Sequence, residues 1–159
     1  MSVDPSELAA FYDRETLGAP ERAVGFVLWR VMHRFQREVD RALAPLGLTH
    51  LQFTTLAMVG WLGRAGTPVT QAELARRAEI HPMQVSLMLK ALEAKVLVAR
   101  PRSRSDTRAK NVEITPEGLA RLRAAMPVVI ALQRDLFGDA GAPGGILLME
   151  LDAVEARGS

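Results

Sequence analysis

The sequence contains no cysteine and few aromatic residues. With no thiol, these 159 residues cannot form a disulfide, a cysteine-ligated zinc site, an iron–sulfur cluster or a thiol redox switch. Aromatic residues make up 5% of the chain, while hydrophobic residues make up 48%. We therefore expect a single core built mainly from leucine, valine and alanine.

We expect neither a targeting segment nor a membrane-spanning segment in this sequence. Residues 1–5 lack the basic region and the apolar core of a signal peptide. No apolar run approaches the roughly 20 residues that a bilayer-spanning helix needs. We expect a cytoplasmic protein with no membrane partner.

Catalytic and metal-binding motifs are lacking as well. The sequence has no nucleophile elbow, no phosphate-binding loop and no paired acids in a flanking motif. The histidines His33, His50 and His81 lie far apart and match no metal-ligand spacing. We expect that the protein is not an enzyme and that it binds neither a metal ion nor a cofactor. A small enzyme that uses a pocket histidine such as His33 remains an alternative, which an activity screen of His33→Ala would test.

Charge is distributed unevenly along a chain whose net charge is only +2. Residues 100–110 contain one acid and five basic residues, for a local net charge of +4, whereas residues 139–159 have a net charge of −3. The basic residues are Arg100, Arg102, Arg104, Arg108 and Lys110. A basic cluster on a nearly neutral protein fits local anion binding. Taken alone, it would fit a solvated loop equally well.

Most of the chain has helical periodicity. Pro20 suits a first helical residue, and apolar residues then recur every three or four positions as far as Leu43. This pattern predicts one amphipathic helix over residues 20–44, about 37 Å long, after a short helix over residues 6–14. Capping-box patterns at residues 49–52 and 70–73 begin a second and a third helix.

A fourth helix and a hairpin follow. After a turn at residues 78–80, a helix is expected over residues 81–93, with Val85, Met88, Leu89 and Leu92 as its buried stripe. Residues 97–100 and 111–114 are the expected strands of a hairpin. Two helices at this spacing can present one to the DNA major groove, and a basic hairpin beside them can reach phosphates or the minor groove.

Two more helices complete the expected fold. Thr115 caps the first, which continues to Leu136 and should bend at Pro127, and a glycine-rich linker leads to the second over residues 146–156. The fold class is thus mainly α with a small β-hairpin. Few other segments of the chain are left to cover the apolar stripes of the terminal helices. We therefore predict a homodimer, in which a second copy covers them.

In the order and spacing of its motifs, the chain resembles the MarR family of bacterial transcription regulators. The resemblance covers about residues 20–156 and rests on short segments in the helix-turn-helix, hairpin and fifth helix. These are Thr70-Gln71, Glu73-Leu74-Ala75, Val85-Ser86, Leu92-Glu93, Lys95, Arg100, Asp106, Arg108-Ala109-Lys110 and Thr115-Pro116-Glu117-Gly118.

The resemblance implies a winged helix-turn-helix with N- and C-terminal dimerisation helices in one domain over residues 1–159. The DNA-binding lobe would span about residues 49–115, and the dimerisation helices about 20–46 and 116–157. It further implies a repressor that binds a pseudo-palindromic operator in double-stranded DNA and responds to a small-molecule effector. The residues expected to bind the effector are Trp29, His33, Phe53 and Trp61, although each also fits ordinary core packing.

The candidate DNA-binding residues lie on the fourth helix and in the wing. Base contacts are assigned to Gln84, Ser86 and Lys90, with apolar contacts from Met83 and Leu87 to thymine methyl groups. The wing set comprises Arg102, Ser103, Arg104, Asp106, Arg108 and Lys110. Arg108 fits either minor-groove insertion or an ion pair with Asp106 or another nearby acid. His81 fits either a phosphate contact or a helix cap.

Four residues around the fourth helix depart from the family pattern. Glu79 and Val96 stand where the family has glycine, and Val96 is expected to end the helix without a left-handed cap. Leu87 and Ala91 stand where basic or polar residues are common. An alternative function is therefore a winged-helix protein-interaction module that uses Met83 and Leu87 and has no specific DNA readout.

Overall fold

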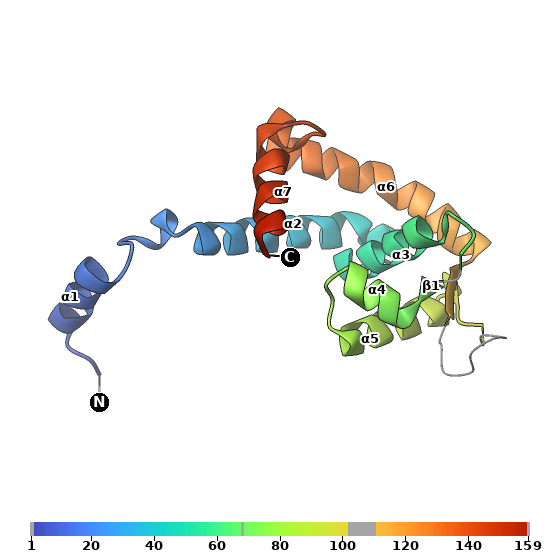
Figure 1. The fold of residues 1–159 in the computed structure, drawn as a ribbon, viewed down its shortest axis with the longest axis horizontal. Helices are drawn as coiled ribbons and strands as arrows, with labels where there is room; N and C mark the ends of the chain where they lie inside the picture. The colour runs from blue at the N-terminus through green and yellow to red at the C-terminus, as the bar shows by residue number, and fades with distance from the viewer. Residues whose placement is uncertain (1, 68, 102–110, 159) are drawn as a thin grey trace. The chain divides into compact units, whose positions relative to one another are not determined.

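The structure is a computed structural model that describes residues 2–67, 69–101 and 111–158. The chain divides into two compact units, Met1–Arg37 and Glu38–Ser159, which we describe one at a time. Figure 1 follows the chain from end to end.

The first unit holds α1 (Pro5–Glu15), a 3₁₀ turn η1 (Pro20–Arg22) and most of α2 (Val24–Leu43). Asp4 caps α1 by accepting a hydrogen bond from the Ser6 backbone N–H at 2.8 Å. The prediction of one helix from Pro20 was wrong, because Ala23 is extended and separates η1 from α2. The α2 helix is therefore 20 residues long, about 30 Å.

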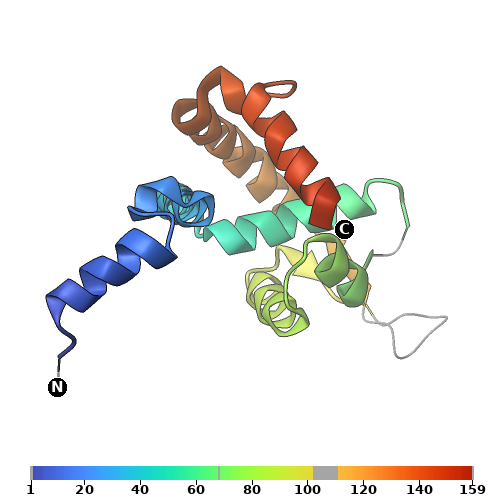
Figure 2. The same ribbon diagram turned by 60° about the vertical axis from the view of Figure 1, so that its left-hand side comes forward.

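The second unit is built around three helices that pack on one another: α3 (His50–Gly63), α4 (Gln71–Arg77) and α5 (Pro82–Ala94). They lie side by side in both ribbon views (Figures 1 and 2). The end of α2 reaches them through a 3₁₀ turn, η2 (Ala44–Leu46). The largest fully buried side chains of the lobe are Leu43, Leu56, Leu74, Leu89, Leu92 and Leu97.

A small antiparallel sheet joins the lobe, with the strand order β1-β3-β2. Its strands are β1 (Val69–Thr70), β2 (Val98–Ala99) and β3 (Asn111–Ile114). The hairpin of β2 and β3 was predicted, although β2 is two residues shorter than expected. The third strand, β1, was not predicted, because two residues carry no alternation that a pattern could detect.

The chain ends in α6 (Pro116–Phe137), a 3₁₀ turn η3 (Gly138–Gly141) and α7 (Ile146–Gly158). The segment expected to be a linker thus contains one turn of helix. Thr115 caps α6 by accepting a hydrogen bond from the Gly118 N–H at 2.9 Å. Gly118 lies against the Leu97 backbone, since a Cβ there would overlap the Leu97 carbonyl oxygen and stand 2.9 Å from its carbon.

The caps of the inner helices differ in part from expectation. At α3 the capping box is complete, with Thr49 and Gln52 each bonded to the other's backbone. At α4 the side chain of Thr70 accepts a bond from the Glu73 N–H at 3.1 Å, and among the described contacts no reciprocal bond from the Glu73 side chain accompanies it.

The prediction that Val96 ends α5 without a left-handed cap was wrong. Val96 has φ +59° and closes a Schellman motif, in which Leu97 N–H bonds Leu92 C=O and Val96 N–H bonds Glu93 C=O, both at 2.9 Å. The apolar contact expected of this motif is available from Leu92 and Leu97, which are both fully buried.

Among the described residues, no single helix has both the length and the apolar content to cross a bilayer, while the bent pair Pro5–Leu46 and His50–Gly63 meets these criteria jointly, by length and composition alone.

Candidate nucleic-acid interface

The α5 helix has a fully buried side and an exposed side. Val85, Leu89 and Leu92 are 0% exposed and fasten the helix to the lobe. The exposed side carries Met83, Gln84, Leu87 and Lys90, and Ser86 is half-buried at its margin. The structure thus brings all five fourth-helix candidates onto one short helix that projects polar and apolar groups outward.

The N-terminus of α5 is set by His81 and Pro82. The His81 ring nitrogen Nδ1 accepts a hydrogen bond from the Met83 backbone N–H at 3.2 Å, and Pro82 occupies the first helical position. Of the two roles open to His81, the cap is the one that this geometry displays. This cap fixes the first turn of α5, which carries Met83 and Gln84.

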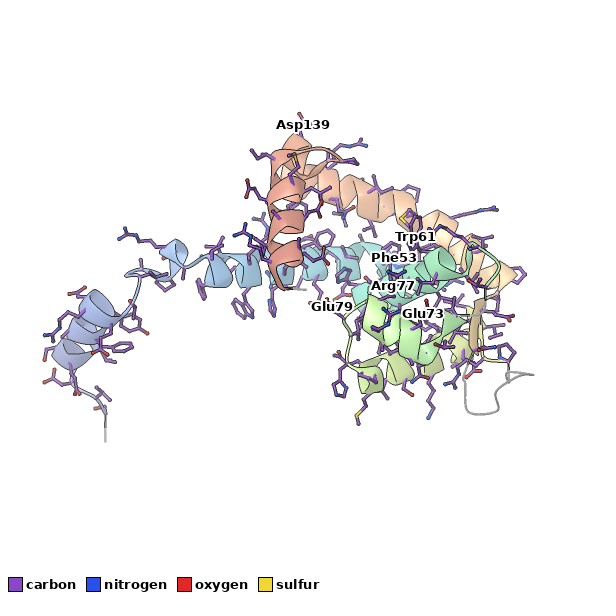
Figure 3. All side chains as sticks on the ribbon, viewed as in Figure 1. Phe53, Trp61, Glu73, Arg77, Glu79 and Asp139 are labelled. Carbon is purple, nitrogen blue, oxygen red and sulfur yellow. The ribbon has the colours of Figure 1, made fainter. Side chains whose placement is uncertain are left out.

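The turn between α4 and α5 depends on Glu79, which has φ +50°. The Ile80 N–H reaches back to the Ala75 carbonyl at 3.1 Å, so this turn also uses a left-handed residue to close a helix. Figure 3 shows Glu79 at the turn and Glu73 and Arg77 on α4. A short left-handed turn lets two helices approach at a large angle, as a helix-turn-helix requires.

One of the five basic hairpin residues is already paired. Arg100 donates through Nε to the Glu93 carboxylate of α5 at 2.8 Å and forms an ion pair with the same oxygen through Nη2. Its guanidinium therefore fastens the start of the wing to α5. The wing candidates Arg102, Ser103, Arg104, Asp106, Arg108 and Lys110 lie outside the described residues.

The four effector candidates belong to two helices. Trp29 and His33 belong to α2, with ring centroids 4.3 Å apart, and line a surface hollow of 530 Å³ together with Arg30, Arg34 and Arg37. Phe53 and Trp61 belong to α3 (Figure 3). Phe53 is buried in the core of the lobe, while Trp61 is exposed beneath the Arg64 guanidinium, 3.4 Å from its ring centroid.

No group of three or more potential metal ligands occurs among the residues that the structure describes. His50 begins α3, and its backbone N–H donates to Asp40 Oδ1 at 2.6 Å. Burial of the imidazole lowers the pKa of His50, and the nearby Asp40 carboxylate opposes that shift in part.

Sequence reasoning missed two residues behind the interface, Lys95 and Arg121. Both donate to backbone carbonyls in the turn after α2, 48 and 75 positions away in the chain. The sequence assigns Lys95 only to a family motif and gives it no contact, because a pattern along the chain cannot reveal a partner so far away. A basic residue in the last turn or C-cap of a helix is the one local signal for such a contact.

The described elements form a winged helix-turn-helix, which is a class of DNA-binding fold. It consists of α4, the turn after it, α5 and the hairpin of β2 and β3, which is the wing. A MarR family model matches residues 48–110, a range that includes α3, α4, α5 and β2. The HTH-type transcriptional repressor Rv2887 of Mycobacterium tuberculosis is 34% identical over 125 residues, which are 79% of this chain and 87% of that protein.

Two solved structures extend the likeness to most of the chain. CouR from Rhodococcus jostii RHA1, bound to p-coumaroyl-CoA, has a TM-score of 0.74 and 27% identity, covering 87% of this chain and 94% of CouR. The MepR–DNA complex of Staphylococcus aureus has a TM-score of 0.73, covering 88% and 98% of the two chains, and at 20% identity it supports the fold alone.

The chain belongs to the MarR family, and it is a DNA-binding transcription regulator. This membership favours DNA binding over the alternative of a protein-interaction module. The relatives are named as regulators and not as enzymes, in line with the lack of a catalytic motif in the sequence.

Proposed function

We propose that the protein is a homodimeric repressor that binds a pseudo-palindromic operator and releases it when a small-molecule effector binds. The observation that carries the proposal is the exposed side of α5, where Met83, Gln84, Leu87 and Lys90 stand clear of the lobe. An α-helix with this outward face fits the major groove, where amide and ammonium groups read base edges and apolar groups contact thymine methyls.

The wing residues complete the proposed interface. Arg102, Arg104 and Lys110 would supply phosphate contacts, and Arg108 either enters the minor groove or pairs with Asp106. Because Arg100 is held by Glu93, we assign it a positioning role at the base of the wing rather than a contact with DNA. Each phosphate contact should add about one unit to the salt dependence of binding.

A homodimer would cover the apolar faces left exposed on the terminal helices. Val24, Leu28 and Met32 recur every four residues along α2, and each is at least 40% exposed. On α7, Ile146, Met149 and Val154 are each more than half exposed. Apolar stripes of this extent usually mark an interface, and a twofold dimer is the commonest way to cover them.

The effector would be an aromatic or thioester-linked anion. Trp29 and His33 offer ring surfaces in the hollow on α2, and Arg30, Arg34 and Arg37 offer positive charge beside them. The ligand in the CouR structure, p-coumaroyl-CoA, has this chemistry. Binding would change the separation of the two recognition helices from the roughly 34 Å of one DNA turn, which would weaken the operator complex.

The first experiment is binding to the DNA upstream of the protein's own gene, at two salt concentrations, with random DNA as the control. We expect a preference of several hundredfold for the upstream DNA and a steep salt slope. Arg104→Ala should lower that slope by about one unit, and Gln84→Ala should relax base preference without changing the slope.

One result would contradict the proposal, and a second would move the search for the operator to other DNA. Absence of binding to either DNA at low salt would remove DNA recognition and favour the protein-interaction module. Salt-dependent but equal binding to both DNAs would argue against self-regulation, and selection from a random-sequence library would then test for an operator elsewhere. Once a site is known, aromatic carboxylates and their coenzyme A thioesters can be titrated for release of DNA.

A further inference from the structure

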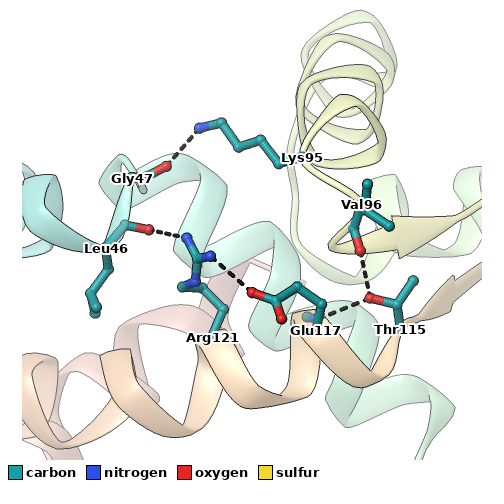
Figure 4. Close-up of polar contacts among 8 residues, drawn as sticks. Leu46, Gly47, Lys95, Val96, Thr115, Glu117 and Arg121 are labelled. Atoms are coloured by element: carbon teal, nitrogen blue, oxygen red, sulfur yellow. Dashed lines mark hydrogen bonds and ion pairs between the residues drawn. The ribbon is translucent and has the colours of Figure 1, made fainter.

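Three backbone segments meet at the C-terminal end of α5, which we take as the recognition helix, and they are joined pairwise by side chains. The segments are the turn Leu46–Gly47 after α2, the C-terminal end of α5 and the N-terminal end of α6. The joining side chains are Lys95, Arg121 and Thr115 (Figure 4). We call these contacts the three-way junction.

The hydrogen bonds of the junction link each of the three segments to the other two. Lys95 Nζ, at the end of α5, donates to the Gly47 carbonyl at 2.6 Å and to Gln52 Oε1 at 2.8 Å. Arg121, on α6, donates to the Leu46 carbonyl at 2.5 Å. Thr115 Oγ1 donates to the Val96 carbonyl at 2.7 Å and so ties α6 back to the end of α5.

The electrostatics of the junction favour these contacts. The Leu46 and Gly47 carbonyls end the helical segment that follows α2, where cations are favoured and carbonyl groups lack helical partners. Lys95 and Arg121 both supply charge-assisted hydrogen bonds to them. Glu117 orients Arg121 by accepting from its second nitrogen at 2.9 Å.

Lys95 remains largely exposed, and so its bonds should affect the geometry of the lobe more than its stability. In the part of the chain that the structure describes, no acidic side chain forms an ion pair with Lys95. The Lys95 ammonium group instead donates to two neutral oxygen atoms and thereby holds the end of α5 against the turn Leu46–Gly47. That turn is itself fixed, because Gly47 is left-handed with φ +66°.

A small rotation at this end of α5 would have a large effect at the other end. The helix has 13 residues, about 20 Å at 1.5 Å per residue. Pivoting it by roughly 10° about its C-terminus would displace its N-terminus by roughly 3.5 Å, close to the 3.4 Å that separates successive bases of one strand. The junction therefore lies where a slight change of angle alters which bases Gln84 can reach.

We propose that Lys95 and Arg121 are positioning residues for DNA recognition, which set the angle of α5 relative to the turn after α2 and to α6 without touching DNA. The inference rests on the proposed dimer, in which α2 and α6 lead into the dimerisation region. In that assembly the junction fixes the relative position of the two recognition helices, and with it the spacing of operator half-sites that the protein accepts.

The test uses the full chain and an operator selected from a random-sequence DNA library with the wild-type protein. From it, duplexes are made with one base pair removed from or added to the centre, together with a duplex that has a single half-site. The variants are Lys95→Met and Arg121→Met. Arg41→Met is the control, since it removes one positive charge and an exposed ion pair with Glu38 outside the junction.

We expect wild type and Arg41→Met to bind the selected spacing at least tenfold more tightly than either altered spacing. Lys95→Met and Arg121→Met should narrow that ratio threefold or more, with unchanged affinity for the single half-site. The double variant should narrow it no further than the stronger single variant, because both contacts hold the same turn. Circular dichroism and thermal melting confirm that each variant is folded, and Lys95→Gln or Arg121→Gln replaces the Met variant at the same position if that variant is not folded.

An unchanged spacing ratio in both variants would overturn the inference. A uniform loss of affinity at every spacing, with a smaller salt slope, would also overturn it, because that is the behaviour of a direct phosphate contact. A wild-type protein with no spacing preference would instead refute the proposed dimeric operator binding, on which the inference rests. The three failures are thus distinguishable.

Discussion

At the scale of single residues, Val96 has a conformation that suits its chemistry poorly. Its φ of +59° is open to glycine at little cost, whereas a β-branched side chain crowds the backbone there. The side chain is 65% exposed, and so packing compensates little. The Schellman motif and the Thr115 bond to its carbonyl hold the residue in place.

We expect Val96→Gly to stabilise the protein. Relief of left-handed strain, about 1–3 kcal/mol, should exceed the entropy that glycine adds to the unfolded chain, about 0.5–1 kcal/mol. A net gain of about 1 kcal/mol corresponds to a rise in Tm of roughly 2–4 °C for a chain of this size. Val96→Ala is the matched control, and it should gain less because it keeps a Cβ. Equal or lower stability of Val96→Gly in urea denaturation would contradict the argument.

Leu87 is the residue that most alters the expected base readout. It is 57% exposed on the outer side of α5, where it can offer methyl groups but no hydrogen bond. If it contacts a thymine methyl, replacing that thymine with deoxyuridine should weaken wild-type binding about fourfold, since a buried methylene is worth about 0.8 kcal/mol.

The deoxyuridine effect should vanish in Leu87→Ala, which completes a double-mutant cycle between protein and DNA. Deoxyuridine placed outside the half-sites is the control for general changes in the duplex. Equal sensitivity of wild type and Leu87→Ala to the substitution would show that Leu87 does not read the methyl group.

At the scale of elements, the start of α3 is held by groups from two parts of the chain. Thr49 and Gln52 form its capping box, and Asp40 of α2 accepts the His50 backbone N–H. The half-buried His50 imidazole has a lowered pKa, mainly because of burial. The folded state therefore binds this proton more weakly than the unfolded state does.

This shift predicts a loss of stability on acidification. The unfolding free energy should fall as pH drops below the ordinary histidine value of about 6.5, because protons then favour the unfolded chain. His50→Gln removes this contribution, and so its unfolding free energy should fall less than that of wild type between pH 7.5 and 5.5. Urea denaturation at the two pH values measures the difference, and parallel losses would contradict it.

Helices with strong caps and clear periodicity could be predicted from the sequence, whereas short or long-range features could not. The bounds of α3, α5 and β3 follow from local patterns that the structure reproduces within a residue or two. The strand β1 depends on its pairing with β3, which local propensity cannot reveal, and the periodic pattern continued through Ala23 without marking the break there. Val96 was singled out, but the prediction underestimated how well the Schellman motif can impose a left-handed residue.

The candidate site shows the same limit. The exposed side of α5 could be predicted, because helical periodicity separates buried from exposed positions. The pairing of Arg100 with Glu93 could not, since a run of basic residues gives no sign of which one has a partner seven positions earlier. The same holds with greater force for Lys95 and Arg121, whose partners are backbone carbonyls that carry no side-chain signature.

At the scale of the whole molecule, the exposed apolar face of α7 predicts the oligomeric state. Wild type should have a mass near twice 17.4 kDa by light scattering at micromolar concentration. Val154→Glu places a charge on this face, at a side chain that is 58% exposed in the single chain. Loss of one buried valine from each subunit costs about 1.5–3 kcal/mol apiece, and so the dimer dissociation constant should rise at least a hundredfold.

Ala156→Glu is the control, because it adds the same charge two residues further along α7, on nearly the opposite side of the helix. It should remain dimeric. Both variants should keep wild-type helix content, since Val154 lies outside the core of its own chain. Val154→Glu should also lose at least a hundredfold in operator affinity, because a monomer engages only one half-site. A monomeric wild type, or a Val154→Glu variant that dimerises like wild type, would show that α7 faces no second copy and that the apolar face serves another partner.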